Sequence, residues 1–143
     1  MLQRNDMTDV FSITKRSQIM SHISGKNTKP EIIIRKIVHS LGYRFRLHKK
    51  ELPGKPDIVF PKYKKVIFVN GCFWHGHKNC LRSKLPSTNK KFWKEKIEGN
   101  KRNDKSSKVK LKKLGWVYLV IWQCEINKSN IGKLENRILN FLS

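Results

Sequence analysis

Side chains that could bind a metal are concentrated in one short segment. Residues 72–80 contain two cysteines and two histidines, namely Cys72, His75, His77 and Cys80. Thiolate and imidazole donors are the ligands that zinc prefers in tetrahedral sites, and Cys124, the only other cysteine, can supply a fourth. We therefore expect a closed, structural zinc site that uses all the cysteines and one of the two histidines, which spacing alone does not separate. Thiols beside unrelated histidines are the alternative.

Acidic side chains are scarce, with 10 Asp and Glu in 143 residues, and three of them occupy defined positions. Asp57 follows Pro56 and opens an apolar run, while Glu31 and Asp104 are further candidates. Hydrolysis of a phosphodiester needs charge neutralised at the phosphate and an activated water, which Mg²⁺ held by carboxylates can supply. Each residue also has a structural explanation. Asp57 can close a turn, Glu31 can cap a helix, and Asp104 can pair with neighbouring bases.

Aromatic residues lie among polar and basic ones in two places. Phe73 and Trp74 belong to the cysteine-containing segment, and lysines surround Phe92 and Trp93. Apolar side chains in such a setting can insert between base pairs, and a mismatched pair is the least costly place to open the stack. The alternative is that these rings belong to the hydrophobic core.

The net charge of the chain is +22, from 32 Lys and Arg against 10 Asp and Glu, and both halves carry the excess. This charge predicts a polyanionic partner, with solubility alone as the alternative. Nucleic acid is preferred to a membrane, because the apolar runs are far shorter than the roughly 20 residues that span a bilayer. The start of the chain, Met1 to Val10, is polar and does not resemble a secretion signal. We therefore expect a cytoplasmic protein.

One α/β domain over residues 1–143 is expected to position these side chains, with residues 1–11 as a flexible N-terminal arm. A short basic helix is predicted at Ser12–Ser21. A second helix begins at a capping box made by Thr28 and Glu31. Its apolar face comprises Ile34, Ile37, Val38 and Leu41.

Four short segments have the patterns of β-strands. Alternation over residues 43–48 predicts a half-buried strand with His48 on its polar side. The apolar runs Asp57–Phe60 and Lys65–Val69 predict two central strands joined by a tight connection, and Trp116–Trp122 predicts a last strand.

The remaining chain alternates an irregular segment with helices. The segment Asn70–Pro86 shows no periodic spacing of apolar residues and is expected to be irregular. A helical pattern follows this segment, and Gly99 is expected to break it. Helices are predicted from Ser87 or Thr88 to Ile97, at Asn100–Leu114 and at Ser129–Phe141. The resulting order predicts a mixed central sheet with helices on both faces.

Four ordered blocks of sequence carry a family resemblance. They are Leu52–Asp57 (LPGKPD), Val66–His77 (VIFVNGCFWHGH), Phe92–Ile97 (FWKEKI), and the segment from Leu114-Gly115-Trp116 to Trp122-Gln123-Cys124. From about Ile13 to Cys124 the chain resembles the very-short-patch repair (Vsr) DNA mismatch endonucleases. The resemblance implies a restriction-endonuclease-like fold of the PD-(D/E)xK type. It also implies Mg²⁺-dependent incision 5′ to the thymine of a T·G mismatch, which initiates repair of deaminated 5-methylcytosine.

The resemblance assigns roles to individual residues. Asp57 is expected to bind Mg²⁺ together with the backbone carbonyl of Val69, and His75 to activate the attacking water. Glu31 and Asp104 are expected to support them, through metal-bound water or by orienting His75. The expected zinc ligands are Cys72, His77, Cys80 and Cys124, and the expected wedge that enters the DNA is Phe73, Trp74 and Trp93.

The chain departs from the family pattern at two places. Asn70 stands where many relatives have a second active-site histidine, so the role of that histidine is open here. Two residues separate His77 from Cys80 where some relatives have one, and we expect the zinc site to tolerate this change.

The expected partner is duplex DNA with a T·G mismatch, bound by a monomer in the bacterial cytoplasm at the nucleoid. MutL-like mismatch-repair proteins and a repair polymerase are further expected partners. Two other functions fit the residues: a sequence-specific restriction-type endonuclease and a zinc-stabilised DNA-binding module without catalysis. Cleavage of both strands of matched DNA would indicate the first of these, and binding without cleavage the second.

Overall fold

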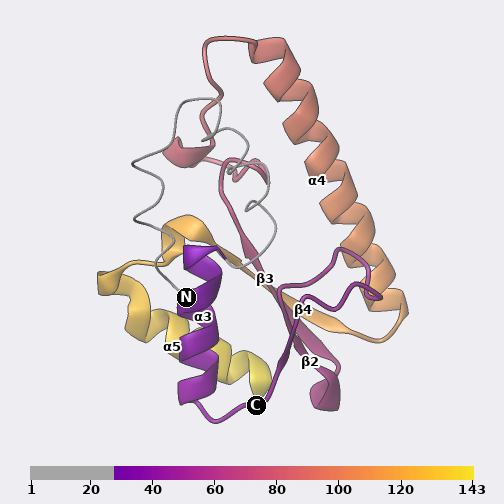
Figure 1. Ribbon diagram of the computed structural model, residues 1–143, viewed down its shortest axis with the longest axis vertical. Helices are drawn as coiled ribbons and strands as arrows, with labels where there is room; N and C mark the ends of the chain where they lie inside the picture. The colour runs from indigo at the N-terminus through magenta and orange to yellow at the C-terminus, as the bar shows by residue number, and fades with distance from the viewer. Residues whose placement is uncertain (1–27) are drawn as a thin grey trace, which may run out of the picture.

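Residues 28–143 are the part of the chain that the computed structural model describes, and a four-stranded sheet lies at its centre (Figure 1). The predicted arm at residues 1–11 and the predicted helix at Ser12–Ser21 lie outside these residues. The helices are α3 (Lys29–Ser40), α4 (Lys90–Lys113) and α5 (Ile131–Leu142). The strands are β1 (Arg46–Leu47), β2 (Ile58–Phe60), β3 (Lys65–Asn70) and β4 (Val117–Trp122).

The sheet is mixed, as the sequence predicts. Its strands stand in the order β1-β2-β3-β4. The first three are antiparallel, with Ile58 opposite Ile67, whereas β3 and β4 are parallel, with Val69 opposite Ile121. Two adjacent parallel strands must be joined by a long crossover connection, and the segment that contains α4 provides this connection. The carboxyl ends of β3 and β4 therefore lie side by side, and the cysteine-containing segment and Cys124 follow directly from them.

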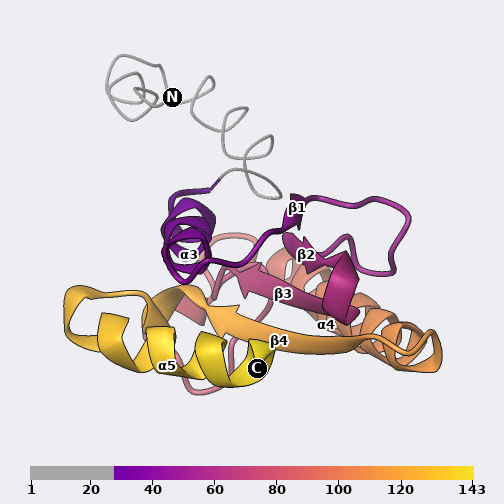
Figure 2. The same cartoon turned by 90° about the horizontal axis from the view of Figure 1, so that it is seen from below.

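Helices cover both faces of the sheet, which confirms the predicted layers. In Figures 1 and 2, α3 and α5 lie on one side of the strands and α4 on the other. Ile34, Ile37 and Val38 of α3 are buried against Leu134 and Ile138 of α5 in the core between these helices and the sheet. The α4 side has a smaller core made of Leu52, Val59, Val66, Phe68 and Leu111.

The edge strand β1 is shorter than its sequence pattern suggests. Only Arg46 and Leu47 pair with β2, and Leu47 is exposed rather than buried. Tyr43 and Phe45 pack against the core from an irregular segment, with both rings edge-on to Phe60. Alternation over residues 43–48 thus reflects side-chain burial without the backbone pairing of a full strand.

Helix α4 is one continuous helix, so the predicted break at Gly99 is wrong. A glycine inside a helix costs only about 1 kcal/mol relative to alanine, and burial of Ile97 and Leu111 on the inner face offsets that cost. The helix begins after Asn89, one residue beyond the predicted caps Ser87 and Thr88.

Within residues 28–143, no helix is long and apolar enough to cross a membrane. The longest, α4, is rich in lysine along its whole length.

Candidate active site and metal centre

Four predicted metal ligands converge where the carboxyl ends of β3 and β4 meet. One ligand atom each from Cys72, His77, Cys80 and Cys124 lies within 4.8 Å of every other. Nδ1 of His77 is 3.4 Å from Sγ of Cys124, and Cys72 is fully buried. Ligands about 2.0–2.3 Å from a tetrahedral zinc are spaced in this way. The donor set and the geometry therefore fit zinc, and His75 lies outside this group of four.

The tight turn after β3 separates the two histidines. Hydrogen bonds from His75 N–H to the Gly71 carbonyl and from His77 N–H to the Cys72 carbonyl define the turn. Gly76, between the histidines, has a φ of +58° and packs so closely on α4 that a Cβ atom would lie 2.7 Å from Ile97. Only glycine combines this left-handed conformation with such an approach. The turn directs His77 to the cysteines and His75 to α4.

Trp122, the last residue of β4, holds the ring of His77. The two rings are stacked, with centroids 4.0 Å apart and planes 8° from parallel. His75 contacts the same indole edge-on, at 6.5 Å between centroids. Beyond Trp122 the chain turns through Gln123–Glu125, where a Glu125 carboxylate oxygen accepts from the Trp122 N–H at 3.2 Å. Trp122 and this turn thus fix both His77 and the neighbouring Cys124.

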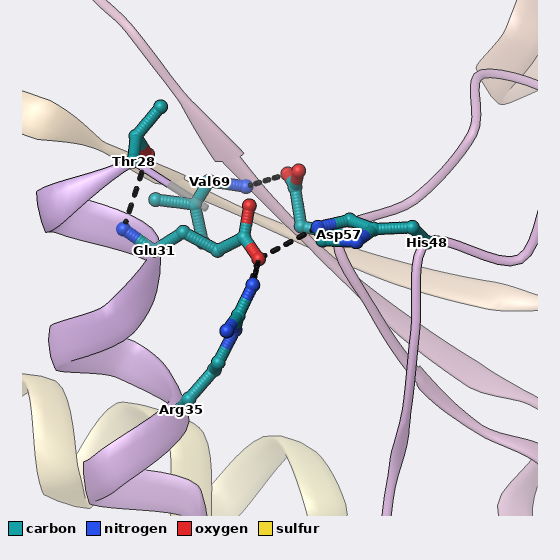
Figure 3. A network of polar contacts seen from close by, with 6 residues as sticks. All are labelled: Thr28, Glu31, Arg35, His48, Asp57 and Val69. Atoms are coloured by element: carbon teal, nitrogen blue, oxygen red, sulfur yellow. Dashed lines mark hydrogen bonds and ion pairs between the residues drawn. The ribbon is translucent and has the colours of Figure 1, made fainter. Parts of the chain in front are cut away.

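A second polar cluster joins α3 to the start of β2 (Figure 3). Asp57 lies just before β2, and its Oδ2 accepts a hydrogen bond of 2.7 Å from the Val69 N–H of β3. Glu31, in the first turn of α3, is 1% exposed, and its Oε2 accepts from Arg35 and, at 2.7 Å, from Nε2 of His48. Ligand atoms of Glu31, His48 and Asp57 lie within 4.8 Å of one another.

Burial gives Asp57 unusual acid–base behaviour. It raises the pKa of the Asp57 carboxyl from 3.8 to about 8, against the opposing effect of the Val69 N–H hydrogen bond. Glu31 raises this pKa further through its charge and through a hydrogen bond between the two carboxyl groups. A buried pair of carboxyls that retains a proton is a site where a cation can replace that proton.

The structure pairs His75 with Asp104 of α4. Nδ1 of His75 is 2.7 Å from Oδ2 of Asp104, and both side chains are partly exposed. They lie on the wall of a surface cavity of about 570 Å³, which Lys55 and Lys96 also line. An imidazole whose Nδ1 is held by a carboxylate presents Nε2 for proton transfer. Asp104 therefore lies where it can orient His75, whereas Glu31 lies against Asp57.

The three predicted wedge residues form one aromatic group. Phe73, Trp74 and Trp93 contact one another edge-on, with centroids 5.3 to 5.8 Å apart. All three are partly exposed, and Phe92, which touches Trp93 at 5.1 Å, is 58% exposed. The group joins the turn after β3 to the first turn of α4. It lies outside the two buried core clusters, in keeping with a surface role.

Three residues at these sites were not found by sequence reasoning. Arg35 and His48 contact Glu31. Trp122 contacts His75 and His77. The alternation of residues 43–48 placed His48 on the exposed side of a strand, and Trp122 was part of a continuous apolar run. Asn70, the residue that departs from the family pattern, is 5% exposed and stands opposite Trp122 in the parallel register.

Comparison with known proteins places the chain in a family. The family model described as DNA mismatch endonuclease Vsr matches residues 8–82, which is more than half of the chain. The type II nicking enzyme V.XorIIP of Xanthomonas oryzae pv. oryzae is 48% identical over 136 residues, covering 95% of this chain and 98% of that protein.

Two further relatives agree with this match. The type II nicking enzyme V.NmeAIP of Neisseria meningitidis is 43% identical over 93% of this chain and 95% of its own length. The DNA mismatch endonuclease Vsr of Escherichia coli K12 is 38% identical over 84% of this chain and 76% of its own length. The chain is an endodeoxyribonuclease and belongs to the Vsr family of DNA mismatch endonucleases.

Proposed function

We propose that this endonuclease nicks one strand of duplex DNA 5′ to the thymine of a T·G mismatch, in a Mg²⁺-dependent reaction that initiates very-short-patch repair of deaminated 5-methylcytosine. The observation that carries the proposal is the presence of two acid–base pairs: Asp57 beside Glu31, and His75 bonded to Asp104. A protein that only binds DNA needs neither. The relatives named nicking enzymes and mismatch endonuclease support the single-strand cut and the mismatch.

Asp57 and the backbone carbonyl of Val69 would hold Mg²⁺, with Glu31 in support. The Val69 N–H already bonds the Asp57 carboxylate, so the two residues are adjacent, and Glu31 lies beside them with ligand atoms within 4.8 Å of those of Asp57. When bound, Mg²⁺ would neutralise charge on the scissile phosphate and acidify water. This arrangement at the start of a central strand supports assignment to the restriction-endonuclease-like, PD-(D/E)xK-type fold.

His75 would act as the general base. Its Nε2 would accept a proton from the attacking water, and the carboxylate of Asp104 would stabilise the charge that the imidazole gains. Lys55 and Lys96, on the wall of the same cavity, would attract the phosphate backbone.

Phe73, Trp74 and Trp93 would enter the stack beside the mismatch. A T·G pair is less costly to unstack than a matched pair, so an aromatic wedge favours mismatched duplexes without reading every base. The basic surface of α4 and the net charge of +22 would supply affinity that does not depend on sequence.

Cys72, His77, Cys80 and Cys124 would hold a structural zinc ion. Four protein ligands leave no position open for water, so this ion would stabilise the loop rather than catalyse. Protein purified without chelator should contain about one equivalent of zinc, and His77→Ala should lose it together with stability. His39→Ala, in the last turn of α3, is the matched control. Zinc-free wild-type protein would contradict the assignment.

The activity is tested with duplex oligonucleotides labelled on each strand. The wild-type protein with Mg²⁺ should cut only the thymine strand of a T·G duplex and leave T·A and C·G duplexes intact. Asp57→Asn should abolish the cut, whereas Glu51→Gln, at an exposed position in the preceding turn, should not. Cleavage of both strands of matched DNA would contradict a mismatch nickase, and binding without cleavage under any divalent metal would contradict catalysis.

The wider setting belongs to the same proposal. The protein would act as a monomer on chromosomal DNA in the bacterial cytoplasm, with MutL-like proteins assisting and a repair polymerase replacing the nicked strand. A panel of T·G duplexes with different neighbours would define the sequence preference.

A further inference from the structure

His48 contacts both Glu31 and Asp57, the acidic residues of the proposed Mg²⁺ site. Its Nε2 lies 2.7 Å from Oε2 of Glu31, seventeen residues away in the sequence. Its backbone N–H donates a hydrogen bond of 3.2 Å to the carbonyl oxygen of Asp57. One residue therefore binds the side chain of Glu31 and the backbone of Asp57, while lying in neither α3 nor β2.

The backbone of His48 is held in a conformation that non-glycine residues rarely adopt. Its φ of 49° lies in the left-handed region, as do those of only four other non-glycine residues in the described part of the chain. Such a conformation persists where the surrounding contacts stabilise it. Here the His48 N–H bonds Asp57 at the next position of the antiparallel β1–β2 register, and the imidazole ring reaches Glu31.

The contacts of Glu31 are divided between its two carboxylate oxygens. Arg35 and His48 both bind Oε2. Figure 3 shows the other oxygen turned toward Asp57, and ligand atoms of the two residues lie within 4.8 Å of each other. The two contacts to Oε2 therefore fix the orientation of the Glu31 carboxylate beside Asp57.

We propose that His48 is a positioning residue of the active site, which with Arg35 holds the Glu31 carboxylate beside Asp57 and thereby maintains the divalent-metal site. This inference rests on the proposed Mg²⁺-dependent activity and adds a residue to it. Ligand atoms of Glu31, His48 and Asp57 lie within 4.8 Å, so direct coordination by the imidazole is the competing role. Nε2 of His48 faces Oε2 of Glu31 at 2.7 Å, so this nitrogen is engaged with the carboxylate. That nitrogen is then unavailable to a metal.

Three substitutions separate these roles. His48→Ala removes the imidazole, and His48→Gly removes it while leaving a residue that adopts a φ of 49° without steric cost. His48→Gln keeps a side-chain N–H that can reach Glu31 but lacks the imidazole that favours transition metals. His39→Ala, at an exposed position of α3, is the control.

The first readout is the Mg²⁺ concentration that gives half-maximal nicking of a T·G duplex. Loss of a residue that orients a metal ligand typically costs about 10- to 100-fold in metal affinity or activity. His48→Ala and His48→Gly should raise the required concentration by about this factor, while His48→Gln and His39→Ala should stay close to wild type. In a Glu31→Gln background, His48→Ala should have little further effect, because its action passes through Glu31.

The second readout is Mn²⁺ binding to zinc-replete protein without DNA, followed by electron paramagnetic resonance. Weaker binding by His48→Ala and recovery in His48→Gln would support the proposal even if wild type failed to nick T·G duplexes. That failure would contradict the proposed function alone. Wild-type metal dependence in His48→Ala would overturn the proposal, as would a His48→Gln variant as impaired as His48→Ala. Absence of Mn²⁺ binding by wild-type protein would overturn both.

Discussion

Nδ1 of His75 and Oδ2 of Asp104 lie 2.7 Å apart, across the junction between the turn after β3 and the middle of α4. The contact depends on the close approach of Gly76 to Ile97, which brings the turn against the helix. Because α4 also connects β3 to β4, the helix that completes the parallel pair of strands supplies the partner of the proposed base.

Asp104→Asn should lower the turnover of a T·G duplex by about 100-fold or more, because general base catalysis contributes about 10²- to 10⁴-fold. The amide can still contact the ring but cannot stabilise its charged form. Duplex affinity, measured without Mg²⁺ by fluorescence anisotropy, should change little. Glu98→Gln is the matched control, since Glu98 lies on the same helix and pairs with Lys101 at 3.6 Å. Equal losses in the two variants would argue against a specific role for Asp104.

Asp57→Asn should stabilise the Mg²⁺-free protein at alkaline pH although it abolishes nicking. Burial raises the pKa of Asp57 from 3.8 to about 8, so the folded state holds this proton more tightly than the unfolded state. The stability contributed by the protonated group is therefore lost as pH rises from about 4 to about 8. The gain in Asp57→Asn above pH 8 should be on the order of 2 kcal/mol.

Urea unfolding at pH 5 and pH 8.5 measures this difference, which should be smaller at pH 5. Added Mg²⁺ should stabilise wild type at pH 8.5 and leave Asp57→Asn unchanged, because only wild type would retain the charged ligand. A variant less stable than wild type at both pH values would show that the carboxyl is needed for the fold.

The elements that could be predicted from sequence are those in which local pattern and tertiary packing agree. The apolar stripes of α3 and α5 have helical spacing and form the main core, and the continuous apolar runs of β3 and β4 lie at the centre of the sheet. Prediction failed at β1 and at Gly99. At these places a local signal, alternation or a helix breaker, was outweighed by contacts with distant residues.

The same distinction applies to the sites. The types and spacing of the cysteines and histidines predict a zinc site from the sequence alone. His48 and Trp122 could not be recognised in this way, because their partners lie far away in the sequence: Glu31 for His48, and His77 for Trp122. The left-handed φ of His48 could not be predicted from its residue type, because glycine is the residue that usually indicates such a conformation.

Trp122→Leu should weaken zinc binding by about tenfold, because the indole that orients the His77 ring is lost while all four ligands remain. Competition with a chromophoric chelator measures the affinity. Trp116→Leu is the control: Trp116 packs against the smaller core near the opposite end of β4, so its loss should lower stability but leave zinc affinity unchanged. Equal zinc affinities in Trp122→Leu and wild type would show that the stack does not orient His77.

Trp93→Ala should reduce discrimination between T·G and matched duplexes. Trp93 contacts both Phe73 and Trp74, so its removal takes away one side of the aromatic group and the support of the other two rings. Stacking of one ring on a base is worth about 1–3 kcal/mol, and affinity for the T·G duplex should fall by about tenfold or more.

A 2-aminopurine beside the mismatch reports this insertion directly, because its fluorescence rises when it is unstacked. The rise on binding of wild-type protein should be smaller with Trp93→Ala and unchanged with Val109→Ala, which alters an exposed apolar residue farther along α4. Because the phosphate contacts are retained, affinity for matched DNA should stay near that of wild type. A parallel fall in affinity for matched and mismatched duplexes would assign Trp93 to general DNA binding or to the fold, and the wedge would then consist of Phe73 and Trp74 alone.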